Sequence, residues 1–179
     1  MPDTLCQPPP GSGRILALDV ALRCTGYGVV EVDGRGGCRA VDCGVIRTSA
    51  KERLSECLRR LAGGIRELLD TYQPTTAAIE GGFFFKNART AMVLGAARGV
   101  AMACLAERAI PMYEYAPRRV KQAVCGFGGA GKEQVAMIVA TRLGLNVTQI
   151  QDDATDALAL ALCHAQAASG AALRLAKQV

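Results

Sequence analysis

The sequence predicts an α/β domain in which a mixed five-stranded sheet is flanked by helices. Three strand-like segments come first, and strands and helices alternate after them, which is the pattern that favours this fold class. The length of 179 residues fits one domain with its own core. With 50% hydrophobic residues, no Trp and 4% aromatics, that core is expected to consist mainly of small aliphatic side chains.

The N-terminal part of the domain is predicted to be a β-meander. Residues 1–13 are expected to be a disordered leader, because this Pro- and Gly-rich stretch can bury little apolar surface. The folded domain is expected over 14–168, followed by a C-terminal tail over 169–179. Strand character is found over 14–20, 25–33 and 38–48. A Gly-rich turn joins the last two of these strands and indicates a hairpin.

Helices and further strands follow the meander. In the segment 52–71, apolar residues recur every three or four positions with Arg and Glu between them, which predicts an amphipathic helix packed on the sheet. Pro74 follows, and 75–80 has the apolar character of a buried, central strand. A short strand is expected over 112–115. The other helices are expected over 88–108, 117–125, 132–144 and 152–168.

The helix predicted over 88–108 carries a stripe of small residues at four-residue spacing. The stripe consists of Ala91, Gly95, Gly99 and Ala103. Small side chains allow another backbone to approach closely. Tight packing on the domain's own sheet is the simpler explanation, and an interface between two copies of the chain is the functional one.

Charge and cysteine usage narrow the classes of function. A net charge of +5 is only a weak indication of an anionic partner. The eight cysteines include no Cys-x-x-Cys pair and the chain has one His, which argues against a structural zinc site. We expect free thiols and a cytoplasmic protein without a membrane span, because the N-terminus has no apolar signal segment and no apolar run approaches ~20 residues.

Four acidic residues stand where they could build a metal site. Asp19 and Glu80 each end an apolar, strand-like run, and a carboxylate there is costly to bury unless it is paired or bound to a cation. Asp153 and Asp156 open the last helix, and their i, i+3 spacing places both on one face of its first turn. Simpler explanations exist: exposed strand ends for the first two, and helix capping for the pair, with Asp152 able to supply that cap.

The segments around these acids also match a known family. They read Leu18-Asp19-Val20-Ala21-Leu22-Arg23-Cys24-Thr25-Gly26-Tyr27-Gly28-Val29, Ala78-Ile79-Glu80, and Gln151-Asp152-Asp153-Ala154-Thr155-Asp156-Ala157-Leu158-Ala159. Further matches are Gly95-Ala96-Ala97-Arg98-Gly99-Val100, Tyr113-Glu114-Tyr115-Ala116-Pro117 and Val120-Lys121-Gln122. In order and spacing, over about residues 14–166, the chain resembles the RuvC Holliday-junction resolvases.

The resemblance implies an RNase H-like fold and a homodimer that nicks two opposing strands of a four-way DNA junction. It places Asp19, Glu80, Asp153 and Asp156 on the family's four catalytic positions. These acids would hold two Mg²⁺ ions per subunit, with Mn²⁺ able to substitute, since hard divalent cations prefer oxygen ligands. One ion would activate the attacking water and the other would stabilise the leaving oxygen. A branch-migration helicase complex of the RuvA and RuvB type is the implied partner.

The resemblance also assigns DNA-facing residues. Lys121 and Lys132 match basic positions that face DNA, although each alone is an ordinary solvated lysine. With Arg118 and Arg119 beside it, Lys121 would belong to a phosphate-binding surface. The segment after the second acid adds two further DNA-binding candidates, Phe83 and Lys86. Phe83 matches an aromatic position associated with stacking on an unpaired base, and a simple hydrophobic patch is its alternative.

Three features depart from the family's usual pattern. Val20-Ala21 stand in place of Pro-Gly, which leaves open the turn geometry beside Asp19. Gly81-Gly82 replace a Gln or similar residue after Glu80. Some relatives have His at the Asp153 position, whereas His164 here lies about two helical turns beyond Asp156, so we expect it to be structural.

Competing functions are weaker. The stretch 126–132 fits G-x-x-x-x-G-K, but Glu133 stands where a P-loop needs Ser or Thr, and 118–125 reads as a helix instead of a strand. The other candidates are an RNase H-like nuclease for a substrate such as an RNA–DNA hybrid, a junction-binding protein without cleavage, and an actin-like sugar kinase. Four acids argue against a pure DNA-binding protein, and a kinase of that type needs a much longer chain.

Overall fold

A computed structural model gives the structure of the chain and describes residues 13–81, 87–168 and 177–179. The elements are β1 (Gly13–Asp19), β2 (Cys24–Val32), β3 (Cys38–Arg47), α1 (Leu54–Tyr72), β4 (Thr76–Glu80), α2 (Ala88–Glu107), β5 (Met112–Tyr115), α3 (Pro117–Cys125), α4 (Lys132–Leu143), a 3-10 turn (Val147–Gln149), α5 (Asp152–Ala168) and β6 (Lys177–Gln178). All five predicted strands and all five predicted helices are present, with ends that differ by one or two residues at most.

The strands form one mixed sheet in the order β3-β2-β1-β4-β5-β6. The meander β1-β2-β3 is antiparallel, whereas β1, β4 and β5 are parallel neighbours. The predicted mixed five-stranded sheet is therefore confirmed. A two-residue strand that the sequence analysis missed, β6, pairs antiparallel with β5. Because β1 and β4 run in the same direction, their carboxyl ends, and with them Asp19 and Glu80, lie at one edge of the sheet.

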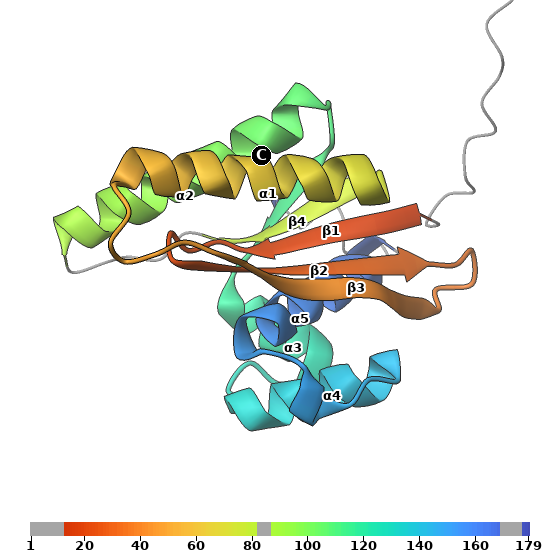
Figure 1. The fold of residues 1–179 in the computed structure, drawn as a ribbon. Helices are drawn as coiled ribbons and strands as arrows, with labels where there is room; N and C mark the ends of the chain where they lie inside the picture. Colours follow the sequence, from red (N-terminus) through yellow and green to blue (C-terminus); the bar gives the residue numbers. More distant parts are fainter. Residues whose placement is uncertain (1–12, 82–86, 169–176) are drawn as a thin grey trace, which may run out of the picture.

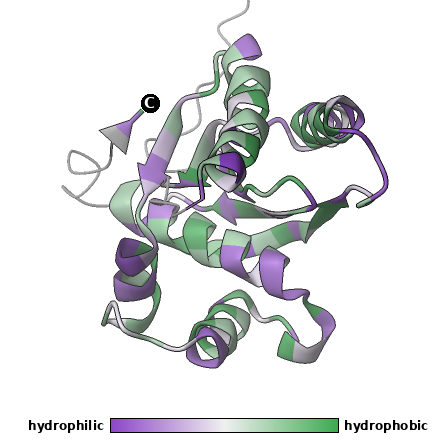
Figure 2. Ribbon diagram, turned by 90° about the vertical axis from the view of Figure 1, so that its left-hand side faces the viewer, coloured by the Kyte–Doolittle hydropathy of each residue, from purple (hydrophilic) through white to green (hydrophobic). Residues whose placement is uncertain are grey.

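Helices cover both faces of the sheet (Figure 1). Helices α1 and α2 lie on one face, and α5 lies on the other with α3 and α4 packed against it. A hydrophobic core lies on each face of the sheet, and successive residues of β1 point alternately into one core and the other, as expected for a strand buried on both faces. Leu16 and Leu18 belong to the core with α1 and α2, and Ile15 and Ala17 to the core with α5. Figure 2 shows hydrophobic residues along the strands and the helices that face them.

Helix α2 does not use its small-residue stripe to pack on the sheet, so the simpler explanation given above is wrong. Its buried residues are Ala97, Ala101, Cys104 and Leu105. Gly95, Gly99 and Ala103 are exposed, and a Cβ added at either glycine would meet nothing within 4 Å. By length and composition alone α2 is also apolar enough to cross a membrane, which the sequence analysis did not expect.

Two glycines on β2 set the position of α5. A Cβ on Gly26 would lie 1.9 Å from the carbonyl oxygen of Asp153, and a Cβ on Gly28 would lie 2.9 Å from the side chain of Leu158. Only residues without a side chain allow the first turns of α5 to lie this close to the strand. This close approach brings the acidic start of α5 to the edge of the sheet where Asp19 stands.

Candidate active site

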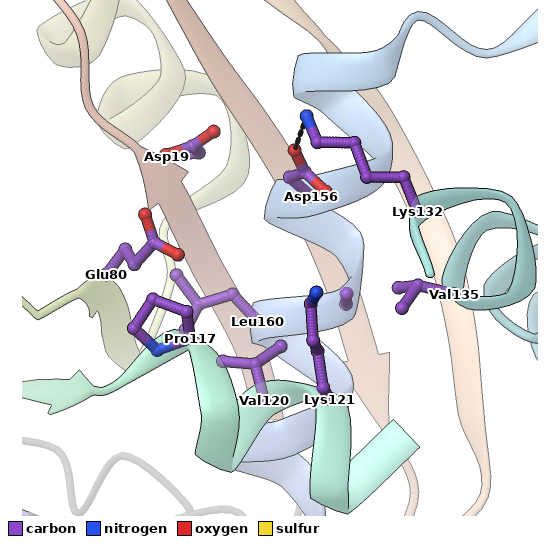
Figure 3. A pocket seen from close by; sticks show the side chains of 10 residues that line it. Asp19, Glu80, Pro117, Val120, Lys121, Lys132, Val135, Asp156 and Leu160 are labelled. Carbon is purple, nitrogen blue, oxygen red and sulfur yellow. Dashed lines mark ion pairs between the residues drawn. The ribbon is translucent and has the colours of Figure 1, made fainter. Parts of the chain in front are cut away.

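Three of the four predicted acids line one cavity of about 340 Å³. Asp19 ends β1, Glu80 ends the neighbouring strand β4, and Asp156 comes from the second turn of α5. Lys121 of α3 and Lys132 of α4 also line the cavity, together with apolar residues that include Val120 and Leu160. Figure 3 shows Asp19 and Glu80 on the strand side and Asp156 opposite them on α5.

The acids of this cavity are harder to ionise than free carboxyls. The pKa of Asp19 is raised from 3.8 to about 6, mainly by burial and then by the negative charges of Asp156 and Asp153. Burial also raises the pKa of Glu80 from 4.5 to about 7, with the charge of Asp19 as the next cause. The pKa of Asp156 is raised by burial as well, against the opposing effect of Lys132. These shifts indicate crowded negative charge in a partly dehydrated site.

The two lysines of the cavity differ in their distance from the acids: an ion pair joins Lys132 to Asp156, whereas Lys121 lies in another part of the lining. The Lys132 ammonium lies 3.5 Å from Oδ2 of Asp156, as the dashed line in Figure 3 marks. Its side chain is 77% exposed, so this ion pair contributes little to stability and leaves the lysine free to reach another anion. Lys121, which belongs to α3, lines another part of the same cavity, away from Lys132. The site therefore combines clustered carboxylates with two cations at its rim.

Asp153 is not among the residues that line this cavity. Its carboxylate accepts a hydrogen bond from the Cys24 thiol, with Sγ 2.8 Å from Oδ2. It still lies close enough for its charge to raise the pKa values of Asp19 and Asp156. Asp153 lies in the first turn of α5, and its carboxylate contacts the start of β2. The structure thus gathers three acids in one cavity and holds the fourth beside it.

The donor set fits a hard divalent cation. Asp19, Glu80 and Asp156 offer only oxygen atoms, and a cation between them would relieve the repulsion that raises their pKa values. In the described parts of the chain, no three His, Cys, Asp or Glu side chains already form a group that could hold a metal ion. The side chains of these acids would therefore have to move closer together when a cation binds.

Comparison with known proteins decides the family. Residues 15–164 match the sequence profile of the family described as "Crossover junction endodeoxyribonuclease RuvC". The chain belongs to the RuvC family. The chain is therefore an endonuclease with an RNase H-like fold. Nucleases of the RuvC family depend on metal ions.

Individual RuvC proteins are similar over most of their length. The chain is 48% identical to the RuvC of Chloroflexus aggregans over 155 residues, which cover 87% of this chain and 94% of that protein. It is 49% identical to the RuvC of Pseudomonas fluorescens strain Pf0-1, covering 87% of each chain. The solved structure of T. thermophilus RuvC in complex with Holliday junction substrate superposes with a TM-score of 0.85 at 34% identity, covering 93% of this chain and 99% of that one.

The turn beside Asp19 is well defined despite the departure from the usual RuvC residues at Val20-Ala21. The buried Thr25 hydroxyl donates to the carbonyl oxygen of Ala21 at 2.6 Å and accepts from its backbone N–H at 3.2 Å. Asp19 itself pairs with Gly26 of β2. The side chain of Thr25 therefore closes the turn in this RuvC sequence.

Sequence reasoning missed two residues that form hydrogen bonds with the RuvC acids. Arg98 of α2 donates to the backbone carbonyl of Glu80 and forms a half-buried ion pair with Glu114 of β5. Cys24 donates to Asp153. Arg98 lies in a segment that carried the RuvC resemblance, so its charge in the apolar middle of the helix was an available signal. The part played by Cys24 depends on a contact between residues 129 positions apart and leaves no local signal.

The other residues predicted to bind DNA do not line the cavity or lie outside the described part of the chain. Arg118 and Arg119 are exposed on α3 and do not line the cavity. Phe83 and Lys86 lie outside the described residues. The Gly-rich stretch after α3 joins two helices, as expected for a link and not for a P-loop.

His164 is structural in its contacts. It is 2% exposed, and its ring nitrogens lie 3.1 Å from the Thr76 hydroxyl and 2.7 Å from the Tyr115 hydroxyl. Burial lowers its pKa from 6.5 to about 4, so the ring is neutral at physiological pH. Thr76 begins β4 while Glu80 ends it, which places His164 at the opposite end of that strand from the acids.

Proposed function

We propose that this protein resolves four-way DNA junctions by nicking two opposing strands during recombination and repair. The observation that carries the proposal is the cavity in which Asp19, Glu80 and Asp156 meet beside Lys121 and Lys132, in a chain of the RuvC family. The T. thermophilus relative whose structure superposes with this chain was solved with a Holliday junction substrate. Junction DNA is accordingly the substrate that we assign.

The four acids would hold two Mg²⁺ ions, with Mn²⁺ able to substitute. Bound divalent cations supply an activated water and charge stabilisation at the leaving oxygen. Asp19 and Glu80 would hold them from the strand ends, and Asp153 and Asp156 from α5. The raised pKa values of Asp19 and Glu80 support this assignment, because perturbed carboxyls grouped in a cavity mark functional sites.

Basic residues would bind the DNA backbone around the acids. Lys121 and Lys132 line the cavity, so they would contact phosphates next to the scissile bond. Arg118 and Arg119 lie exposed on the same helix as Lys121 and would extend this surface. Phe83 and Lys86 complete the set that we propose, from the segment that follows Glu80. The attraction of these cations for phosphates provides affinity without sequence information.

Two opposing nicks require two active sites, and we propose a homodimer that provides them. The exposed stripe Gly95, Gly99 and Ala103 on α2 is the surface that we assign to the interface, because its small side chains leave room for a second backbone. We propose that the dimer acts in the cytoplasm, as the cysteine usage suggests, and that it works with a branch-migration helicase complex of the RuvA and RuvB type, as the family resemblance implies.

A cleavage assay on a synthetic four-way junction tests this function. We expect Mg²⁺-dependent, paired symmetric nicks on the junction and none on linear duplex of the same sequence. Asp19→Asn and Asp156→Asn should abolish cleavage while junction binding survives. Asp70→Asn, which changes an exposed acid of α1, is the matched control and should cleave normally.

Two outcomes would overturn the proposal. Cleavage of an RNA–DNA hybrid without cleavage of the junction would favour the alternative RNase H-like substrate. Junction binding by the intact protein without any divalent-dependent cleavage would leave only the junction-binding function.

A further inference from the structure

The Cys24 thiol is in direct contact with one of the four acids. Cys24 begins β2, and its Sγ lies 2.8 Å from Oδ2 of Asp153 in the first turn of α5. The cysteine is partly buried, so the contact is made at the edge of the site and not in open solvent. A sulfhydryl is a weak donor to neutral groups, but an ionised carboxylate is a strong acceptor, and hydrogen bonds to charged groups are worth more than neutral ones.

The backbone around Cys24 places its side chain on the face of β2 that meets α5. Side chains alternate along a strand, so Cys24 shares this face with Gly26 and Gly28, the two glycines against which α5 packs. The turn before Cys24 is also anchored to the end of β3. Thr48 donates its backbone N–H to the carbonyl of Arg23 at 3.1 Å and its hydroxyl to the carbonyl of Leu22 at 2.8 Å. The backbone that carries the Cys24 thiol is therefore held in position by hydrogen bonds from Thr48.

We propose that Cys24 is a positioning residue of the metal site, which orients Asp153 by donating to one carboxylate oxygen and leaves the other oxygen for a cation. This inference rests on the proposed function, since it assigns Asp153 a ligand role. Carboxylates that bind metals are usually hydrogen-bonded by neighbouring groups, and removal of such a partner typically costs about 10- to 100-fold in metal affinity or activity.

Three substitutions at Cys24 separate the effect of losing the hydrogen-bond donor from the effect of changing the side-chain volume. Cys24→Val keeps a small apolar side chain of similar size and removes the donor. Cys24→Ser keeps a donor, and Cys24→Ala removes the donor with a different change in volume. Cys43→Val, which makes the same exchange at a partly buried cysteine of β3, is the matched control.

The experiment measures Mn²⁺ and Mg²⁺ binding to the full-length protein by isothermal titration calorimetry, without DNA. Cys24→Val and Cys24→Ala should each weaken binding at least tenfold, whereas Cys24→Ser and Cys43→Val should bind like the unmodified protein. Thermal unfolding in EDTA identifies any variant that does not fold. If Cys24→Val or Cys24→Ala fails to fold, metal binding by the other of these two variants tests the inference. In cleavage assays, a higher metal concentration should restore the rate of Cys24→Val.

Unchanged or tighter metal binding by folded Cys24→Val would overturn the inference. Equal weakening by Cys24→Ser and Cys24→Val would also overturn it, because the donor would then be irrelevant. These results are distinct from failure of the proposed function. If the unmodified protein itself binds no divalent cation, the metal site is wrong and the role of Cys24 falls with it.

Discussion

The carboxyls of Asp19 and Glu80 carry an energetic cost in the metal-free protein. Their pKa values in the folded state, about 6 and about 7, lie above the values of 3.8 and 4.5 expected for an unfolded chain. Between about pH 4 and pH 7 the folded protein therefore binds more protons than the unfolded chain. By linkage, these two groups make the metal-free protein less stable as pH rises through that window. The arrangement suits cation binding at the expense of stability.

Replacing Asp19 by Asn should stabilise the metal-free protein at neutral and higher pH. The neutral amide removes a charge that burial and two neighbouring acids disfavour. We expect the free energy of unfolding at pH 8 to rise by roughly 1 to 2 kcal/mol, and the gain to vanish near pH 4, where Asp19 is protonated. Urea unfolding in EDTA at both pH values measures this, with Asp70→Asn as the control. A loss of stability at pH 8 would contradict charge crowding at this site.

At the scale of the elements, the packing of α5 on β2 determines where two of the acids stand. Gly26 lies opposite the backbone of Asp153, and Gly28 opposite Leu158. A side chain at Gly26 would push the first turn of α5 away from the strand. Both acids of α5 would move with that turn, so stability and catalysis depend on the same contact.

Gly26→Ala should therefore be damaging although it adds one methyl group. The new Cβ would lie 1.9 Å from the Asp153 carbonyl oxygen, a distance that forces the backbone to shift. We expect a loss of roughly 1 to 3 kcal/mol in the free energy of unfolding. Junction cleavage should also fall at a temperature where the variant remains folded. Gly63→Ala in α1, where a Cβ meets nothing within 4 Å, is the control and should stabilise the protein by about 0.5 to 1 kcal/mol.

The elements themselves were predictable because their signals are local. Apolar periodicity and the positions of Pro74 and the glycines gave every main strand and helix. The parallel pairing of β1 and β4 then accounts for the meeting of Asp19 and Glu80. The exposed side of α2 was predicted wrongly, because a helix that is apolar nearly all round does not reveal from its sequence which face packs inward. The contacts of Cys24 and Arg98 also depend on tertiary structure.

For the whole molecule, the distribution of charge should govern DNA affinity. Acids gather in the cavity, while Lys121 and Lys132 stand at its rim and Arg118 and Arg119 lie on the adjoining surface. Binding should therefore rely on cations that surround a negatively charged centre. Phosphate contacts of this kind release counterions and make affinity depend steeply on salt.

Lys121→Ala should weaken junction binding and also make it less sensitive to salt. Loss of one phosphate contact should reduce the slope of log K against log salt concentration by about 0.9. Fluorescence anisotropy with a labelled junction, across a series of KCl concentrations in Ca²⁺ or EDTA to prevent cleavage, measures both effects. Lys51→Ala changes an exposed lysine before α1 and serves as the control. An unchanged slope for Lys121→Ala would remove Lys121 from the DNA-binding surface.

Assembly of the whole enzyme should depend on the exposed stripe of α2. Gly99 is exposed, and a side chain added there meets nothing within 4 Å of its Cβ, so Gly99→Arg fits a single folded chain. Arg is also a better helix former than Gly, by up to about 1 kcal/mol. At an interface between two α2 helices, however, its bulk and charge would keep the helices apart. Light scattering should then show a fall from the mass of two chains to that of one.

Cleavage by the same variant links this assembly to function. If two subunits supply the two nicks, Gly99→Arg should lose paired nicking of a junction while circular dichroism shows that the chain is still folded at the assay temperature. Gly63→Arg adds the same side chain at another open position, on α1, and should remain dimeric and cleave in pairs. A dimeric, fully active Gly99→Arg would place the interface elsewhere on the molecule. An unmodified protein that is monomeric at assay concentrations, yet nicks both strands in one binding event, would contradict the proposed dimer itself.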